Sequence, residues 1–129
     1  MLLVEMKPID RIEPYEKNAK KHPDAQVAMI ADSIEQFGFN VPILIDGSGV
    51  IVAGAGRYLA ADKLGMSEVP VIVLDNLTQE QARKFRLADN KVAESKWNEI
   101  LLVEDLTELK ETGCSVLDIP GFPEAEIDK

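Results

Sequence analysis

Residues 50–61 read VIVAGAGRYLAA, and this stretch decides the fold. Its first four residues are apolar, which is typical of a short buried strand. Gly54 and Gly56 interrupt the apolar run, and the residues from Tyr58 onward favour a helix that Gly65 ends. The stretch therefore predicts a strand, a glycine turn and a helix, with Arg57 at the start of the helix.

The glycine turn also predicts a phosphate-binding site. A helix N-terminus leaves backbone N–H groups unpaired and carries about half a positive charge, so it attracts phosphate oxygens. Gly54 and Gly56 permit positive φ and a close approach of the ligand, and Arg57 adds a planar fork that matches phosphate. The alternative is a tight turn that carries an arginine on the surface, and the turn alone does not decide between them.

Three more apolar runs flank this stretch and are bounded by proline, glycine or charged residues. They predict strands at residues 2–6, 41–45 and 69–74. Asp46-Gly47-Ser48-Gly49 follows the second of these runs and predicts a hairpin into the strand at 50–53. We expect all four strands to form one mixed sheet.

Helices are indicated in the remaining segments. Apolar residues at helical spacing predict a helix from Pro23, with Gly38 as its left-handed cap. Thr78-Gln79-Glu80-Gln81 fits the capping box of a helix that runs to about Ala88. A last helix is expected from Asn98 to Thr112. Together these elements predict an α+β fold, a small mixed β-sheet with helices packed around it.

The composition favours a soluble, cytoplasmic protein. The chain has 129 residues, a one-domain length. Its single cysteine, Cys114, cannot form an internal disulfide, which favours a reducing compartment. No apolar run approaches the roughly 20 residues of a membrane span, and the N-terminus does not resemble a secretory signal.

The acidic charge belongs to the end of the chain. The net charge is −9. Residues 98–129 hold nine acids and two lysines, a balance of −7, and residues 1–97 hold fourteen acids and twelve bases, a balance of −2. Proteins that bind duplex DNA tightly usually present a strongly basic face. The sequence therefore predicts no tight, direct DNA binding by this chain.

Four motifs resemble, in the same order, those of the N-terminal domain of the ParB family. They are SIxxFGFxxPIxI, IVAGAGRYLAA, LGMSEVPVIVLDNLT and FRLADNKVAE, and the resemblance covers about residues 3–97. It implies a ParB/sulfiredoxin-like fold. Relatives in this superfamily include CTP-hydrolysing partition clamps, a free-serine kinase, sulfiredoxins and proteins labelled nucleases.

The resemblance also implies a ligand, which is a nucleotide such as CTP, ATP or ADP bound with magnesium, and the residues that contact it. The implied phosphate and nucleotide contacts are Gly54, Ala55, Gly56, Arg57, Asn90 and Lys91. The implied metal ligand is Asp89. From the residues alone, 89–91 can equally be the end of a helix, with Asn90 as its cap and Lys91 complementing the helix dipole.

Departures from the family pattern limit the chemistry. Ala55 stands where sulfiredoxins carry a nucleophilic cysteine and where many phage and plasmid relatives carry a histidine, so a sulfiredoxin activity is not expected. His22 lies in a polar loop and is predicted to be solvated. Glu35 is the remaining catalytic candidate because it can face the glycine turn, and its alternative is a solvated helix position.

The preferred interpretation is a nucleotide-binding regulatory module of a DNA-associated ParB-like protein of phage, plasmid or mobile-element type. We expect no membrane contact, and as partner either a second copy or a DNA-modifying domain. One alternative is an enzyme, an NTPase, metal-dependent nuclease or small-molecule kinase. The other is an interaction module without a ligand, attached to a DNA methyltransferase.

The predicted domains are residues 1–97 and an acidic helix with its tail at residues 98–129. The end of the chain resembles the segment that leads into a DNA methyltransferase domain in phage- and plasmid-type proteins. Since Phe122 lies between two prolines in an apolar segment, we expect a neighbouring domain or subunit to bury it.

Overall fold

The computed structural model describes residues 2–16, 22–93, 99–113 and 120, without the side chains of residues 90, 92, 93 and 99–102. The chain divides into a first unit, Met1–Ala93, and a second unit, Glu94–Lys129. The predicted boundary near residue 97, Trp97 and the segment that contains Phe122 lie outside the described residues.

The first unit contains one four-stranded sheet. Its strands are β1 (Glu5–Pro8), β2 (Ile43–Asp46), β3 (Ile51–Ala53) and β4 (Glu68–Leu74), in the order β1-β4-β2-β3. β4 pairs antiparallel with β1 and parallel with β2, and β2 pairs antiparallel with β3. The predicted mixed sheet is confirmed, and the second, third and fourth strands start within two residues of their predicted positions.

Different helices bury the two faces of the sheet. Side chains two residues apart along a strand share a face. On one face the fully buried Ile43, Ile45, Val69 and Val71 pack with Ala61. On the other, Val52 and Leu74 pack with Ala82. Ala61 belongs to α2 (Ala55–Lys63) and Ala82 to α3 (Gln79–Ala93), so these helices cover opposite faces.

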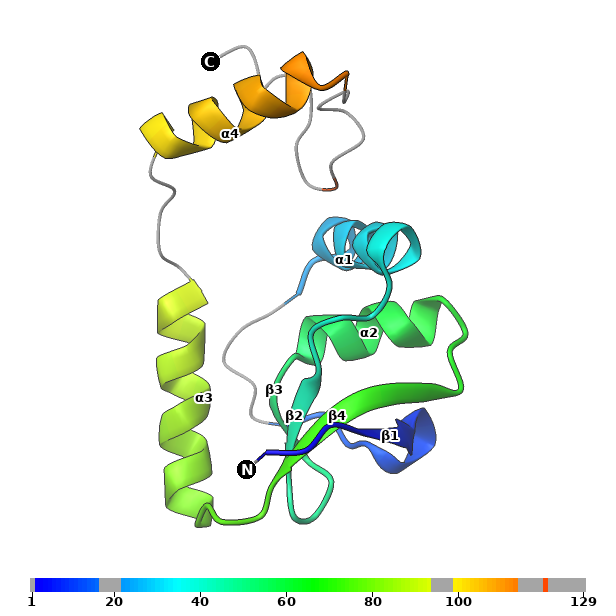
Figure 1. The fold of residues 1–129 in the computed structure, drawn as a ribbon. Helices are drawn as coiled ribbons and strands as arrows, with labels where there is room; N and C mark the ends of the chain where they lie inside the picture. Colours follow the sequence, from blue (N-terminus) through cyan, green and yellow to red (C-terminus); the bar gives the residue numbers. More distant parts are fainter. Residues whose placement is uncertain (1, 17–21, 94–98, 114–119, 121–129) are drawn as a thin grey trace. The chain divides into compact units, whose positions relative to one another are not determined.

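The remaining long helix of the first unit, α1 (Asp24–Phe37), forms an outer layer. It packs on α2 rather than on the sheet, with Val27 and Ala31 against Ala60, and Figure 1 shows the two helices stacked. The expected α+β fold, with helices around a small mixed sheet, is therefore confirmed.

The first strand begins at Glu5 rather than at the predicted Leu2. Its pairing with β4 extends from Glu5, opposite Val71, to Pro8, opposite Glu68. Ile9 then donates its N–H to the Ser67 carbonyl oxygen at 3.0 Å. Because donors alternate along an antiparallel ladder, the Pro8 nitrogen points away from β4, where its missing N–H removes no ladder bond.

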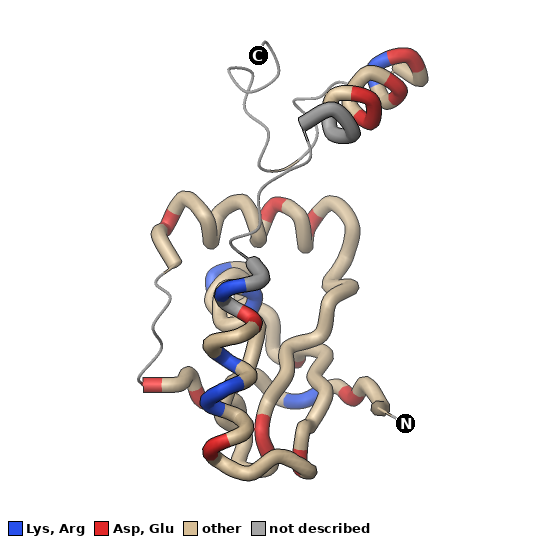
Figure 2. The backbone as a smooth tube through the Cα atoms, turned by 90° about the vertical axis from the view of Figure 1, so that its left-hand side faces the viewer, with Lys and Arg blue, Asp and Glu red and all other residues tan. Residues whose placement is uncertain are grey.

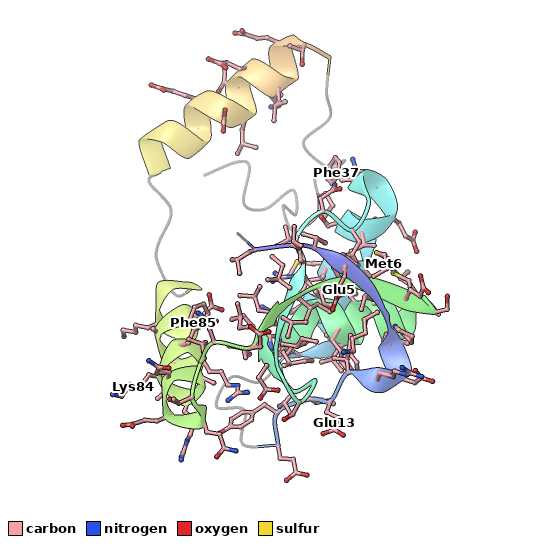
Figure 3. The ribbon with its side chains drawn as sticks, turned by 60° about the horizontal axis from the view of Figure 1, so that its bottom comes forward. Glu5, Met6, Glu13, Phe37, Lys84 and Phe85 are labelled. Carbon is pink, nitrogen blue, oxygen red and sulfur yellow. The ribbon has the colours of Figure 1, made fainter. Side chains whose placement is uncertain are left out.

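The residues before the strand, Leu2, Leu3 and Val4, are exposed and have no partner on β4 in the described pairing. β1 is also an edge strand, and it leaves Met6 more than half exposed beside Glu5 (Figure 3). Only the second half of the apolar run at 2–6 therefore belongs to a strand.

The hairpin between β2 and β3 is confirmed, and Asp46 organises it. The Asp46 Oδ1 atom accepts hydrogen bonds from the N–H groups of Ser48 at 2.9 Å and Val50 at 3.0 Å. An aspartate that bonds its own backbone two residues on is a common way to stabilise a tight turn. Gly49 has a φ of 88° there, and a Cβ on it would lie 3.0 Å from the Arg11 carbonyl oxygen.

The capping box of α3 is confirmed, and a glycine with positive φ ends α1 as predicted, although its ψ of 168° is not that of a left-handed helical residue. Gly38 follows α1 with a φ of 90°, and its N–H donates to the Ile34 carbonyl oxygen at 2.8 Å. At the start of α3, the Thr78 hydroxyl accepts from the Gln81 N–H at 3.1 Å and the Gln81 Oε1 accepts from the Thr78 N–H at 2.9 Å. This reciprocal pair is a capping box.

The predicted end of α3 near Ala88 is wrong, because the helix continues to Ala93. No glycine or proline stands between these two residues to stop it. Asp89 and Asn90 therefore lie inside the helix, so the prediction of Asn90 as its cap is wrong, whereas Lys91 does stand in the last turn, where it complements the helix dipole.

The second unit contains α4 (Glu99–Glu111), which confirms the predicted acidic helix to within one residue at each end. Gly113 follows it with a φ of 88°, the positive angle expected of a glycine that ends a helix. In the described part of the chain, no helix has the length and apolar character needed to cross a membrane.

The glycine turn differs from its prediction in one respect. Gly54 alone forms it, with φ 102° and ψ 24°, and α2 already begins at Ala55. Gly56 therefore lies in the first helical turn and has no positive φ. A Cβ on Gly56 would lie 2.8 Å from Ile30 Cδ1 and 3.1 Å from His22 Nδ1. Gly56 thus allows the close packing of α1 and His22 on α2.

Replacing Gly54 with alanine is expected to destabilise the first unit more than the same change at Gly65. Both residues have positive φ, which costs an L-residue about 1–2 kcal/mol. Nothing lies within 4 Å of a Cβ at Gly65, whereas a Cβ at Gly54 would lie 3.3 Å from Ile43 Cα and 3.1 Å from Arg57 Nη2. Crowding of this kind adds about 1–3 kcal/mol.

The measurement is urea unfolding of the two variants and the wild type, followed by circular dichroism. Gly65→Ala is the matched control, since it isolates the contribution of φ. Equal losses of stability in the two variants would show that the crowding at Gly54 has no energetic effect.

Candidate functional site

A pocket of about 540 Å³ lies in the first unit, where the first turn of α2 faces α1 and α3. Residues 53–57 form one wall, and Ile30, Ile34 and Phe37 of α1 form an apolar part of another. The titratable and amide side chains in its lining are Tyr15, His22, Gln26, Asn40, Arg57, Arg86 and Asp89. Pockets of about 300–1,000 Å³ with a few convergent polar groups are typical ligand sites.

The start of α2 supplies backbone donors to this pocket. The first bond inside the helix runs from the Tyr58 N–H to the Gly54 carbonyl oxygen at 3.0 Å. The N–H groups of Ala55, Gly56 and Arg57 precede it, so the helix itself gives them no acceptor, and no side chain caps the helix. The structure therefore brings all four residues of the predicted phosphate turn to the wall of the pocket.

Arg57 is half-buried, whereas the alternative interpretation of the turn would leave it on the surface. Its guanidinium folds back over Gly54, and Nη2 donates to the Pro42 carbonyl oxygen at 3.4 Å. Nε is buried and has no hydrogen-bond partner among the described residues. Burial lowers the pKa of the Arg57 guanidinium, and the Asp89 carboxylate offsets only part of this shift. The pocket therefore contains a cation that is partly desolvated and has an unused donor.

Arg86 was not predicted as a site residue, yet its side chain is only 10% exposed and lines the pocket. Its Nε donates to the Ile51 carbonyl oxygen at 2.9 Å, and Nη2 lies 3.9 Å from Asp46 Oδ2. Its Cζ lies 3.8 Å from the centre of the Tyr15 ring, a cation–π distance. Arg86 thus ties α3 to β3, to the hairpin and to the segment before α1.

Arg86 also determines where Asp89 lies. Ala82, Arg86 and Asp89 follow the spacing i, i+4 and i+7, so they share one face of α3. Ala82 packs on Val52, Arg86 bonds to β3, and Asp89 lines the pocket. This spacing was a usable signal in the sequence, and it was missed because the helix was predicted to end near Ala88.

His22 was predicted to be solvated, and this prediction is wrong. The side chain is half-buried and lines the pocket. Its Nδ1 lies 2.8 Å from Gln26 Oε1, one helical turn into α1. The ring rests against Gly56, at the start of α2. The structure thus places an imidazole beside the phosphate turn even though the turn itself carries Ala55.

Three further residues, Glu35, Asn90 and Lys91, were predicted for the site. Glu35 is exposed on α1 and does not line the pocket, so the structure does not bring the catalytic candidate to the turn. The Asn90 side chain lies outside the described residues. Lys91 is exposed on α3, two residues after Asp89.

Asp89 is the one predicted metal ligand that lines the pocket. Among the residues that the structure describes, no three His, Cys, Asp or Glu side chains cluster closely enough to hold a metal ion. A magnesium ion at Asp89 would therefore need further oxygen ligands from a bound phosphate and from water.

Residues 3–91 match the ParB N-terminal domain. The chain belongs to this family. ParB-like nuclease domain-containing protein YnaK of Escherichia coli is 47% identical over 83 residues, which are 64% of this chain and 95% of YnaK. The partitioning protein Spo0J of Thermus thermophilus is 33% identical over 125 residues, which are 93% of this chain but 42% of Spo0J. The chain thus spans less than half of that partitioning protein.

Two solved structures share the fold of this chain. The truncated ParB of Caulobacter crescentus, complexed with CTP-γ-S, has a TM-score of 0.76 at 20% identity, over 96% of this chain and 74% of that one. Sulfiredoxin of Arabidopsis thaliana has a TM-score of 0.54 at 27% identity, over 64% of this chain and 96% of that one. The predicted ParB/sulfiredoxin-like fold is therefore confirmed.

Replacing Arg86 with alanine is expected to lower the free energy of unfolding of this ParB-like domain by about 2–3 kcal/mol. The change removes a charge-assisted hydrogen bond from a nearly buried site and leaves the Ile51 carbonyl oxygen without its donor. Arg83→Ala is the control, because Arg83 is exposed on the same helix and such changes usually stay within about 0.5 kcal/mol.

Urea unfolding of both variants measures the difference. If Arg86→Ala is no less stable than Arg83→Ala, then the contacts of Arg86 do not attach α3 to the sheet.

Proposed function

We propose that this ParB N-terminal domain binds a nucleotide, with the phosphates at the start of α2 and on Arg57, and serves as a regulatory module of a DNA-associated ParB-like protein. The observation that carries the proposal is the buried, unpartnered Nε of Arg57 beside an uncapped helix N-terminus. A phosphate oxygen would accept from the N–H groups at the start of α2. It would also satisfy Nε of Arg57 once this side chain turns from Gly54 toward the pocket, because Nε is fully buried in the present structure.

The shape of the pocket supports a nucleotide rather than a small anion. A phosphate would occupy only the end formed by residues 54–57. The walls from Ile30, Ile34 and Phe37 offer apolar surface for a base or a sugar. The Caulobacter crescentus ParB, whose fold this chain shares, was solved with CTP-γ-S. CTP, ATP and ADP are therefore the ligands to test.

Magnesium fits the proposal as a partner of the phosphates. Asp89 places one carboxylate in the lining of the same pocket as Arg57. Without a cation this carboxylate repels a phosphate, whereas a magnesium ion between them turns the repulsion into coordination. Binding should therefore be stronger with magnesium than without it.

The distribution of charge supports a nucleotide rather than duplex DNA as the ligand of the domain. Figure 2 shows lysine and arginine residues along α3 and mainly acidic residues on α4. Lys84, which extends from α3 in Figure 3, pairs with Glu80 at 3.5 Å, so part of the basic charge is already balanced. Tight binding to duplex DNA usually needs several unbalanced cations on one face.

The geometry favours binding over catalysis. A nuclease or a kinase needs a base that is positioned at the phosphate. Glu35 lies outside the pocket, and Asp89, the one carboxylate in the described lining, already interacts with the positive charge of Arg57.

Replacing Arg57 with alanine is expected to weaken nucleotide binding by about one to two powers of ten, because a charge-assisted hydrogen bond contributes about 1.5–3 kcal/mol. Isothermal titration with CTP, ATP and ADP, with and without magnesium, measures the change. Arg83→Ala removes the same charge outside the pocket and should leave the affinity almost unchanged.

Two outcomes would contradict the proposal. Failure of the wild type to bind any of these nucleotides at millimolar concentration with magnesium would favour an interaction module without a ligand. Equal affinities of the wild type and Arg57→Ala would place the nucleotide elsewhere.

A further inference from the structure

His22 is held against the first turn of α2 by contacts on two sides. On one side, its Nδ1 and Cε1 atoms lie 3.1 and 3.3 Å from the position that a Cβ on Gly56 would take. On the other side, Nδ1 bonds to Gln26 of α1 at 2.8 Å. The imidazole therefore lies next to the backbone N–H groups at which the proposed phosphate binds.

The partner of Nδ1 fixes the role of the other ring nitrogen. The Oε1 atom of Gln26 can only accept a hydrogen bond, so Nδ1 of His22 must carry the hydrogen. In the neutral ring Nε2 is then a bare acceptor. A phosphate oxygen also only accepts, so it repels that nitrogen. A phosphate bonds to Nε2 only when Nε2 is protonated too, which makes the ring an imidazolium.

Three charged side chains line the same pocket as His22. They are Arg57 of α2, and Arg86 and Asp89 of α3. The α1 residues in contact with the ring or beside it, Gln26 and Ile30, are uncharged. A bound phosphate would add negative charge next to the ring, and a negative charge at contact distance favours the imidazolium over the neutral imidazole.

We propose that His22 is a phosphate-contacting residue of this pocket and that it takes up a proton when a nucleotide binds. This inference rests on the proposed function and adds a proton linkage to it. Ala55 leaves the phosphate turn without an imidazole, and His22 supplies one from the residue pair that precedes α1. Affinity should accordingly rise as the pH falls, across the range of about pH 5–8 in which histidine changes its charge.

The chain offers a direct readout, because His22 is the only histidine in the sequence. Its imidazole C–H resonance in a nuclear magnetic resonance spectrum therefore reports one site, provided that the protein carries no histidine tag. The experiment titrates the pH of the wild-type chain alone, and with saturating CTP, ATP or ADP plus magnesium. We expect a bound nucleotide to move the titration midpoint to higher pH by about one unit, a tenfold linkage.

A variant separates this linkage from the titration of the phosphate itself. His22→Gln keeps a polar side chain at position 22 but cannot take up a proton. Isothermal titration in buffers of different ionisation enthalpy counts the protons bound with the nucleotide. The wild type should take up more than His22→Gln, and the variant should lose about tenfold in affinity at pH 6 and little at pH 8.

The possible results are distinct. An unchanged midpoint for His22 in the presence of a nucleotide that binds, or equal proton uptake by the two proteins, would overturn the role of His22 and leave the proposed function standing. Failure of the wild type to bind all three nucleotides would overturn both. Circular dichroism of His22→Gln verifies its fold, and the wild-type resonance decides the matter even if the variant is unstable.

Discussion

Gly54 turns the chain from β3 into α2 with a left-handed backbone, and the site depends on this one conformation. Because the turn is a single residue, the first N–H groups of α2 face the pocket directly after a buried strand. The same turn leaves room for Arg57 to fold back over the backbone toward the Pro42 carbonyl oxygen. The fold thus concentrates positive potential at one point without a run of basic residues in the sequence.

The balance of charge around that point explains why an anion would be stabilised there. Arg57 is half-buried and has an unused donor. Arg86 is nearly buried, and its contacts are the Ile51 carbonyl oxygen, the Tyr15 ring and the Asp46 carboxylate at 3.9 Å, so only one of the three carries a negative charge. Partly desolvated cations interact more strongly with an anion than exposed ones do. Asp89 offsets part of this charge in the absence of a ligand, and under the proposed function it would help to hold a magnesium ion beside the phosphates.

Local sequence signals predicted most of the fold. The apolar runs, the Asp46 hairpin, the glycine caps and the Thr78–Gln81 capping box depend on neighbouring residues alone, so they can be read from the chain. The two exceptions have different causes. The start of β1 depends on its tertiary pairing with β4, which the sequence does not show. The end of α3 was predicted too early, although no glycine or proline near Ala88 ends the helix.

The candidate site was only partly predictable, because part of it depends on tertiary contacts. Gly54 and Arg57 belong to one short motif, and the sequence marked both as candidates. Gly56 was assigned to the turn, whereas in the structure its lack of a side chain leaves the space that Ile30 and His22 occupy. His22 and Arg86 reach the pocket only through contacts between segments distant in the sequence, with Gly56 in one case and Ile51 in the other. No local pattern predicts the contact of His22 with Gly56. The spacing of Ala82, Arg86 and Asp89 indicates a shared face of α3, but not that Arg86 bonds to Ile51.

The central claim is that the start of α2 holds the phosphates of a nucleotide, and backbone amide spectra test it most directly. The chain labelled with nitrogen-15 would be titrated with CTP and with cytidine, and with ATP and adenosine, each with magnesium. The account predicts that the amide resonances of Ala55, Gly56 and Arg57 shift strongly with a nucleotide and little with the matching nucleoside. Equal shifts with nucleotide and nucleoside, or shifts confined to residues outside the pocket, would contradict it.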